Sequence, residues 1–444
     1  MTTSQQSQPS APQAESDARP KPPPPYPSAP GEPDRDVLIR LMEPQATQDP
    51  YPIYAWLREH APAYYSQFGT YVLSRHADVE FVLKHADLFP GVRPEAMAQM
   101  FPQAAEHEAY QVLVTSLVGS NPPKHTRLRR LIGNGFTARR MADLTTGLER
   151  WADVVLAEAA DRLRAGETID LHSAVSAPMP MHMISDLIGI PTADRRRLAE
   201  RVPDMMNVVD PAAGPEAVQR ADDAFAELGE YLEDLIRLRR ADPADDLISA
   251  MISTRNDEPD QLDDDELRTL FFTLWAAGFE TTATAIDNAV ILLLADGSRA
   301  KWLQTPEGTS AFVAETLRYE PSVQVAPGIR FAAETVQLGE ETIVGGSQVR
   351  LLIGAANRDR DAFTDADSFD PARTGGAKPL SFGAGIHYCL GAGLAQVEMA
   401  VILPKLHAAF PGLALAGPPE RRRSIPLRDF VRLPVTLETP PGRT

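Results

Sequence analysis

The 444-residue sequence contains a single cysteine, Cys389. One cysteine cannot form an intramolecular disulfide, so nothing here indicates an oxidising compartment. Positive charge is scarce too, because 43 lysines and arginines face 61 acidic residues and give a formal net charge of -18. Since nucleic-acid-binding proteins are usually basic, this balance argues against a nucleic-acid partner.

Long apolar runs are also missing. No run approaches the roughly 18 residues that span a bilayer, and the longest covers residues 289–295. The N-terminus lacks the basic start and apolar stretch of a signal peptide. We therefore expect a soluble, cytoplasmic protein without a membrane partner.

Proline is concentrated at one end of the chain. Residues 1–36 hold ten of the 40 prolines, and apolar anchors are scarce there. Such a segment buries too little surface to offset its ordering entropy, so we expect a disordered, proline-rich tail. It would be either a plain solvated tail or a proline-motif ligand for a partner protein. Residues 37–444 would then form one large domain.

The patterned part of the chain predicts a mainly α-helical fold with a smaller β region, an α+β arrangement with a small antiparallel sheet. Helices dominate because apolar residues recur at helical spacing over most of the first 320 residues. The expected elements are a helix at 47–60, a β-hairpin at 62–74, helices from 76 to 320, short strands at 329–353, a helix from 389 to 409 and a last hairpin at 424–438.

The cysteine stands in a glycine-rich loop, SFGAGIHYCLG, at residues 381–391. Gly383 and Gly385 allow backbone shapes that are closed to other residues, and a close approach to a flat ligand. Cys389 would lie where a helix begins, and backbone N–H groups and the helix dipole there favour a thiolate. A thiolate on such a loop suits haem iron, whereas zinc is disfavoured because the sequence offers no second cysteine.

This loop resembles the haem-thiolate signature of the cytochrome P-450 monooxygenases, in the style of the soluble bacterial members. The resemblance extends over about residues 45–438. It implies the P-450 fold and a bound heme b, with Cys389 as the iron ligand. Phe382, Gly383 and Gly391 would belong to the cofactor-binding loop.

Residues 263–296 predict one long helix that opens with the capping pair Asp263 and Glu266. Its centre, AGFETT at 277–282, places a glycine and a charge inside an apolar run. A solvent-facing turn would explain this pattern, but a broken local rule more often marks function. The string resembles the oxygen-activation motif of the same family, an acid followed by a threonine.

That resemblance assigns a role to four residues of this helix. Ala277 would face the haem, and Gly278 would leave room above it. Thr281 would hydrogen-bond dioxygen or its water, and Glu280 would relay protons from solvent.

Residues 314–321, AETLRYEP, place Glu315 and Arg318 on one helix face. Alone, this spacing is also that of an ordinary exposed ion pair worth tenths of a kcal/mol. Its order and distance before the cysteine resemble the ExxR motif of the family. The resemblance implies a buried pair that Arg373 joins from the loop before the cysteine.

Haem carries two carboxylates that need cationic or donor partners. By the same resemblance these partners are His125, Arg129, Arg330 and His387. Without the resemblance, His125 would be taken for a surface histidine at the start of a helix. Asn121 replaces the acidic residue that usually opens this segment.

The substrate side is predicted to be apolar, which favours a medium or large hydrophobic substrate. The resemblance places Met206, Val209, Val323, Val325 and Leu427 in the pocket. Gln324 and Arg428 would orient a polar group of the substrate, and Asp429 would constrict or polarise the pocket because a small residue is common at its position.

The sequence therefore predicts a haem-thiolate monooxygenase that hydroxylates or epoxidises a hydrophobic small molecule, either free or bound to a carrier, in bacterial secondary metabolism. Electrons would come from a ferredoxin and its ferredoxin reductase, with Arg127, Arg130, Arg139 and Arg140 in a local basic patch for docking. Two alternatives stay open. The same fold can catalyse oxidative coupling or another atypical oxidation, and a catalytically silent relative can serve as a recruitment platform.

Overall fold

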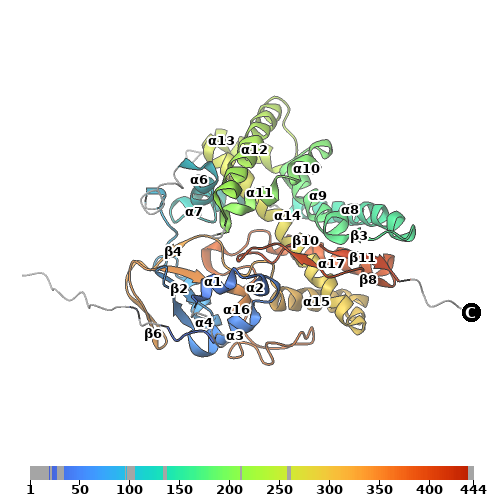
Figure 1. The fold of residues 1–444 in the computed structure, drawn as a ribbon. Helices are drawn as coiled ribbons and strands as arrows, with labels where there is room; N and C mark the ends of the chain where they lie inside the picture. Colours follow the sequence, from blue (N-terminus) through green and yellow to red (C-terminus); the bar gives the residue numbers. More distant parts are fainter. Residues whose placement is uncertain are drawn as a thin grey trace, which may run out of the picture.

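A computed structural model describes residues 20, 23–27, 35–95, 97, 106–133, 138–210, 213–257 and 262–438, without the side chains of 138–143, 145 and 254–257. Helices make up most of it (Figure 1). The α-helices are α1 (Val37–Leu41), α2 (Pro44–Gln48), α3 (Tyr51–His60), α4 (His76–Lys84), α6 (Glu108–Thr115), α7 (Lys124–Gly133), α8 (Ala138–Arg164), α9 (Pro178–Ile188), α10 (Thr192–Ala199), α11 (Val202–Met205), α12 (Pro215–Ala241), α13 (Leu247–Asp257), α14 (Asp264–Ala295), α15 (Pro306–Tyr319), α16 (Ile353–Ala356) and α17 (Ala392–Ala409). Tighter or wider turns form η2 (His172–Ser176, a π-helix), η3 (Met206–Val209), η4 (Gly297–Gln304) and η5 (Gly385–His387).

The strands are short and form four small sheets. They are β1 (Ala63–Tyr65), β2 (Thr70–Leu73), β3 (Ile169–Asp170), β4 (Arg330–Phe331), β5 (Val336–Leu338), β6 (Glu341–Ile343), β7 (Gln348–Leu351), β8 (Leu413–Leu415), β9 (Glu420–Arg421), β10 (Phe430–Arg432) and β11 (Pro434–Leu437). The largest sheet has the order β1-β2-β7-β4, and a three-stranded sheet has the order β3-β11-β8. The mainly α-helical fold with a smaller β region is as predicted.

Helix α14 is the central element of the fold and runs through the middle of the molecule (Figure 1). Asp263 accepts from the Glu266 N–H at its start, and the Glu266 side chain accepts from the Asp263 N–H, which confirms the predicted capping pair. Among the described residues, α14 is the one helix long and apolar enough to cross a membrane, but 72% of that apolar window is buried inside the protein. Its apolar character therefore reflects packing against α9, η2 and α17.

Two predictions about strands are wrong in detail. The predicted hairpin at 62–74 forms, with β1 antiparallel to β2, but β2 also pairs in parallel with β7, so the sheet is mixed. Residues 424–438 do not make a hairpin of their own. Instead β10 pairs with β9, while β11 pairs with β3 and β8, because strands far apart in the chain supply the partners.

Most of the predicted proline-rich tail lies outside the described residues. Within the described part, Tyr26 packs edge-on against Trp56 of α3, with ring centroids 5.1 Å apart. The Arg40 guanidinium lies over the Tyr26 ring, 5.0 Å from its centroid.

Candidate active site

The loop that carries Cys389 is held in a tight shape by its own backbone. Gly383 and Gly385 have φ angles of +70° and +65°, which favour glycine, as the sequence predicted. A Cβ on Gly385 would also lie 2.4 Å from the Leu83 carbonyl oxygen of α4. The Cys389 N–H donates to the Phe382 carbonyl at 2.9 Å, and α17 begins three residues later. The loop therefore presents Cys389 just before the start of a helix.

The Cys389 side chain is exposed. Surrounding protein atoms still desolvate the thiol on its inner side, and this burial raises its pKa, while the Gly391 backbone and Arg129 act to lower it. The helix start thus supplies one stabilising group of the predicted kind, the Gly391 backbone N–H, and α7 supplies Arg129, but the two do not outweigh desolvation of the thiol. A metal ion would supply the missing positive charge, because a coordinating thiol is deprotonated.

Glu315 and Arg318 of α15 form a buried ion pair, with side chains 5% and 1% exposed. Arg373 reaches the same carboxylate, with Nη2 3.3 Å from Oε1 of Glu315. Arg318 and Arg373 also donate to the Ser368 carbonyl, at 3.0 Å and 2.8 Å. The three residues predicted to group together are in contact, and they tie α15 to the segment that leads to Cys389.

Asn357 links this arrangement directly to the cysteine loop. Its backbone carbonyl accepts from Arg318 Nη1 at 2.8 Å, and its side-chain oxygen accepts from the Leu380 N–H at 2.7 Å. Its side-chain nitrogen donates to Ser381 Oγ at 2.8 Å, and Ser381 in turn donates to the Leu317 carbonyl. The candidate site residues predicted from the sequence do not include Asn357, which is fully buried and whose role depends on contacts between distant segments.

Four groups that can carry positive charge converge beside this loop: His125, Arg129, Arg330 and His387. The two imidazole rings are 4.2 Å apart between centroids, and Arg129 Nη2 donates to the Tyr388 carbonyl at 2.6 Å. Arg330 Nη1 donates to the Phe89 carbonyl at 3.2 Å. The sequence prediction therefore selected residues that the fold brings together from α7, β4 and η5.

This cluster has no acidic counterpart among the described residues. Burial, followed by Arg129 and Arg330, lowers the pKa of His125. Burial, together with Arg330, His125 and Arg129, lowers the pKa of His387 to about 3. Both ring nitrogens of His125 and Nε of Arg330 are buried without a hydrogen-bond partner. Buried donors of this kind need acceptors, and a ligand with two carboxylates would satisfy them.

The centre of α14 presents two different faces at residues 277–281. Ala277 is exposed, and its carbonyl accepts from Thr281 Oγ1 at 2.9 Å, so the threonine hydroxyl stays next to this open face. Gly278 is half-buried, and a Cβ there would lie 2.7 Å from Ile184 of α9. Close packing of two helices therefore explains Gly278, in addition to the predicted room above a cofactor.

Glu280 lies on the buried side of α14 and is 3% exposed. Burial raises the pKa of Glu280, His172 acts to lower it, and Asp429 acts to raise it. Its Oε1 is buried without a hydrogen-bond partner. The acid therefore lies inside the protein, on the same stretch of helix as the exposed Ala277 and the half-buried Thr281. A residue that carries protons into a site would lie in such a place.

The predicted pocket residues separate into two groups. Met206 and Val209 of η3 are half-buried and pack against the largest apolar cluster. Val323 is half-buried and pairs through an isolated β-bridge with Leu427, which is buried. Val325 instead packs in a core cluster with Tyr54 and Leu352, because its strand-like bridge to Leu352 turns it inward. The structure thus places Val325 in the core and not with the others.

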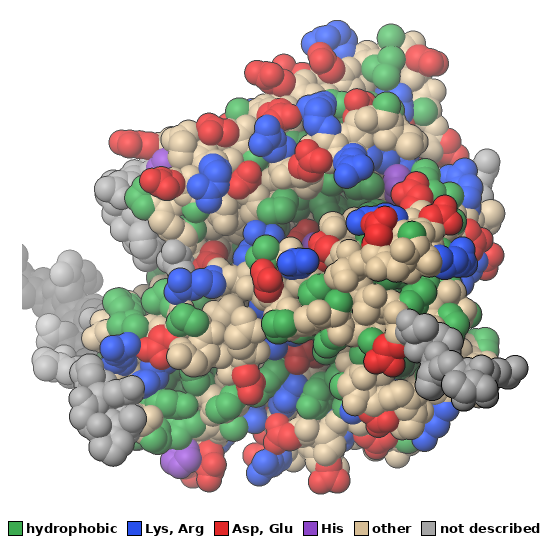
Figure 2. All heavy atoms as spheres, turned by 45° about the vertical axis from the view of Figure 1, so that its right-hand side comes forward, with side chains coloured by type: hydrophobic (Ala, Val, Ile, Leu, Met, Phe, Trp, Pro, Cys, Tyr) green, Lys and Arg blue, Asp and Glu red, His purple; other side chains and the backbone are tan. Residues whose placement is uncertain are grey.

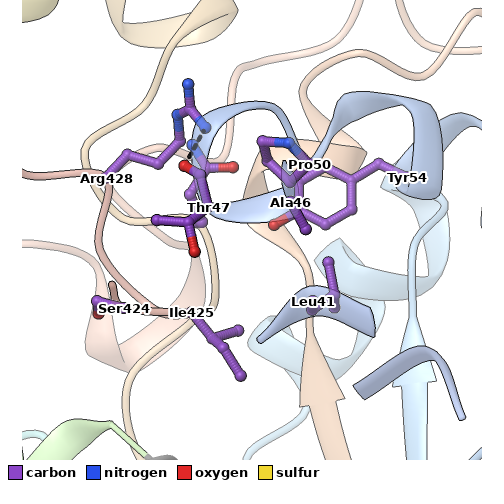
Figure 3. A pocket seen from close by; sticks show the side chains of 9 residues that line it. Leu41, Ala46, Thr47, Pro50, Tyr54, Ser424, Ile425 and Arg428 are labelled. Atoms are coloured by element: carbon purple, nitrogen blue, oxygen red, sulfur yellow. Dashed lines mark hydrogen bonds between the residues drawn. The ribbon is translucent and has the colours of Figure 1, made fainter. Parts of the chain in front are cut away.

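Gln324 and Arg428 are committed to contacts within the protein. Gln324 donates to the Pro321 carbonyl at 2.7 Å. Arg428 forms an ion pair with Glu320 and donates to the Thr47 carbonyl, beside a small hollow lined by residues of α2 and α3 (Figure 3). Their predicted role in orienting a polar substrate group is therefore not supported by where they lie.

The surface is hollowed on one face between the helical part above and the β10 region below (Figure 2). Hydrophobic side chains lie inside this hollow, and charged side chains of both signs lie around it (Figure 2). An apolar recess with a polar rim is the usual form of a small-molecule site.

The arrangement as a whole fits a haem group. Cys389 offers a soft ligand, the cationic cluster offers partners for two carboxylates, and the Ala277–Thr281 stretch offers an alcohol on the open face of α14. The orphaned nitrogens of His125 and Arg330 are the observation that favours a dianionic cofactor most directly, because buried polar groups are otherwise paired.

Comparison with known proteins agrees with this geometry. Residues 57–305 and 303–411 match the family described as Cytochrome P450. Cytochrome P450 BJ-3 of Bradyrhizobium diazoefficiens is 39% identical over 414 residues, which cover 91% of this chain and 96% of the relative. Mycinamicin IV hydroxylase/epoxidase of Micromonospora griseorubida is 35% identical over 370 residues, which cover 82% and 89% of the two chains.

Solved structures show the same likeness. P450BioI, solved in complex with an acyl carrier protein that carries hexadec-9Z-enoic acid, is 29% identical and superposes with a TM-score of 0.79. The similarity covers 89% of this chain and 99% of that chain. It therefore includes most of the part of the chain that the structure describes.

Proposed function

Because this chain belongs to the cytochrome P450 family and is a P450 monooxygenase, we propose that it hydroxylates or epoxidises a hydrophobic small molecule in bacterial secondary metabolism. The substrate would be either free or bound to a carrier protein. The naming of one relative as a hydroxylase/epoxidase and the carrier-protein complex of another support these two points. The protein would act in the cytoplasm.

The cofactor proposed is heme b. Cys389 would ligate its iron, and His125, Arg129, Arg330 and His387 would hold its carboxylates. When bound, the group supplies the oxidising chemistry of dioxygen activation. The observation that carries the proposal is the cluster of His125, Arg129, Arg330 and His387 beside Cys389, in which buried nitrogens of His125 and Arg330 have no hydrogen-bond partner among the described residues.

The protein's own residues would then divide the remaining work. The Glu315–Arg318–Arg373 arrangement and Asn357 hold the cysteine loop through the Leu380 N–H and Ser381. Thr281, held by the Ala277 carbonyl, positions a hydroxyl proton at the open face of α14. Apolar residues around the site exclude water from the substrate. Glu280 holds a proton behind Thr281 and delivers it to that side chain.

A redox partner is a general need of the family, and a ferredoxin with its reductase is the partner we propose. Arg130 of α7 is exposed and supports a local basic surface for an acidic partner. Arg127 contributes less than predicted, because it is paired with Glu266 of α14.

The deciding experiment is the reduced carbon monoxide difference spectrum of the purified protein. A thiolate-ligated haem gives the family's characteristic long-wavelength band, and Cys389→Ser should abolish that band. Protein that takes up no haem, or an unchanged spectrum of the variant, would contradict the proposal. Substrate-induced spin-state shifts, followed by product analysis under labelled dioxygen, would then separate oxygen insertion from oxidative coupling.

A further inference from the structure

Charged groups from three further parts of the fold surround Glu280 on the buried side of α14. Asp287 lies two turns along the same helix, and His172 lies on η2. Arg422 follows β9, and Asp429 precedes β10. All four contribute to the electrostatic environment of the Glu280 carboxylate. The sequence selected Asp429 as an unusual pocket residue, but the structure places it with this buried cluster.

Three carboxylates of this cluster are incompletely paired, and Oδ1 of Asp287 is one of the buried oxygens without a hydrogen-bond partner. Oδ1 of Asp429 and Oε1 of Glu280 are both buried without a hydrogen-bond partner. The two side chains are 4% and 3% exposed. The backbone brings Glu280 and Asp429 into the same region. Ser322 Oγ donates to the Thr281 carbonyl at 2.7 Å, and the N–H of Arg428, the residue before Asp429, donates to the Ser322 carbonyl at 3.0 Å. A buried carboxylate oxygen without a partner takes up a proton or a bridging water, because an unpaired charge is costly there.

His172 is a fixed charge in this cluster and not a proton donor at neutral pH. Its Nδ1 lies 2.7 Å from Oδ2 of Asp287, which is fully buried. Burial by itself lowers the pKa of His172, but the charge and hydrogen bond of Asp287, with Glu280 and Asp170, raise it to about 9. A group that keeps its proton below pH 9 stabilises neighbouring carboxylates but does not exchange protons with them efficiently.

Arg422 connects the cluster to the surface. Its Nε donates to Asp429 Oδ2 at 2.5 Å, and its side chain is 34% exposed. Asp204 of α11 also contributes to its electrostatic environment, and Asp204 is itself paired with Arg220. The polar side chains between solvent and the centre of α14 are therefore, in order, those of Arg422, Asp429, Glu280 and Thr281.

We propose that Asp429 is the relay residue that returns protons from solvent to Glu280, with Arg422 holding it in place. After Glu280 gives its proton toward Thr281, the Asp429 carboxylate takes up a proton from solvent beside the exposed side of Arg422. It then passes that proton to Glu280, directly or through a water, and is again the carboxylate that pairs with Arg422. No electron moves in either step. This inference rests on the proposed monooxygenase function.

The test combines Asp429→Asn, which keeps shape and removes the acid, with Asp429→Glu, which restores it. Asp204→Asn is the matched control, because Asp204 lies near Arg422 but does not act on Glu280. The first readout needs no turnover: the infrared carboxylic-acid band of Glu280, defined as the band lost in Glu280→Gln, is titrated against pH in the haem-bound protein.

Asp429→Asn should move the midpoint of that titration down by about one pH unit, because a nearby negative charge has been removed. Arg422→Gln should move it up, and Asp204→Asn should leave it in place. In turnover, Asp429→Asn should raise the share of electrons lost as peroxide roughly threefold to tenfold, and Asp429→Glu should reverse most of this loss. The double variant with Glu280→Gln should be no worse than Glu280→Gln alone.

The relay would be overturned if the infrared titration midpoint of Glu280 did not move in Asp429→Asn. It would also be overturned if Asp429→Asn and Asp429→Glu lost the same share of electrons as peroxide and both had a lower melting temperature, because that result indicates a structural role. The proposed function fails separately. It fails when the unmodified protein gives no thiolate carbon monoxide band. The relay fails when Asp429→Asn shows that band and converts electrons to product as completely as the unmodified protein does.

Discussion

Arg318 holds the Glu315 carboxylate in a two-point contact, with Nε 2.8 Å from Oε2 and Nη2 2.7 Å from Oε1. The same guanidinium donates to backbone carbonyls of Asn357 and Ala366. One side chain of α15 therefore fixes two segments that precede the cysteine loop. Because both partners are almost fully buried, neither charge can be hydrated when the other is removed.

Glu315→Gln should destabilise the protein by about 3–5 kcal/mol, since it leaves the Arg318 charge buried and uncompensated. We expect loss of haem or failure to fold, measured as haem content after purification and as the urea midpoint. Glu307→Gln is the control, because Glu307 lies exposed in the first turn of the same helix and is worth no more than about 1 kcal/mol there. A haem-replete, equally stable Glu315→Gln protein would contradict this prediction.

Thr281→Ala should leave haem binding intact but reduce product formed per electron by about tenfold or more. The reason is that the hydroxyl held by the Ala277 carbonyl is the proton-bearing group at the open face of α14. Nicotinamide consumption, peroxide and product are measured together. Thr281→Ser keeps the hydroxyl and should stay coupled, while full coupling in the alanine variant would refute the assigned role.

Arg330→Leu should have opposite effects on the two states of the protein. Arg330 is buried beside two histidines, and burial lowers its pKa, so its removal should stabilise the haem-free form. The same change should weaken haem binding by about 1.5–3 kcal/mol, the value of a hydrogen bond to a charged group. Haem transfer to an excess of acceptor protein, and urea unfolding of the haem-free form, measure the two effects. A lower urea midpoint of the haem-free variant, or an unchanged rate of haem transfer to the acceptor protein, would argue against a carboxylate site here.

The His172–Asp287 pair predicts a pH-dependent stability. The pKa of His172 is raised to about 9 in the fold, compared with about 6.5 in an unfolded chain. A raised pKa means that the folded state holds the proton more tightly, so the stabilisation is fully present below about pH 6.5 and is lost as pH rises through about 9.

The free energy of unfolding should therefore fall over this window by about 3 kcal/mol at most. Urea midpoints measured at intervals from pH 6 to 10 test it. Asp287→Asn should remove most of this pH dependence, because the carboxylate that holds the imidazolium is gone. A wild-type profile that is flat over this range, or a variant with the same slope, would show that the pair does not carry this stability.

The sequence by itself determined the elements and residues whose identity depends on local pattern. The capping pair at α14, the glycine angles of the cysteine loop and the Glu315–Arg318 contact follow from residue type and short spacing. Helices and tight turns are set within a few residues, which is why the capping pair and the glycine angles are as predicted.

Only the tertiary structure decided which distant segments meet. It paired β2 in parallel with β7, turned Val325 into the core, and placed Asp429 beside Arg422 and Glu280. Nothing local selects these partners, since each contact joins residues far apart in the chain and depends on how whole elements pack. Burial then changed the chemistry of Glu280, because removal of its carboxyl group from water raises the pKa of that group.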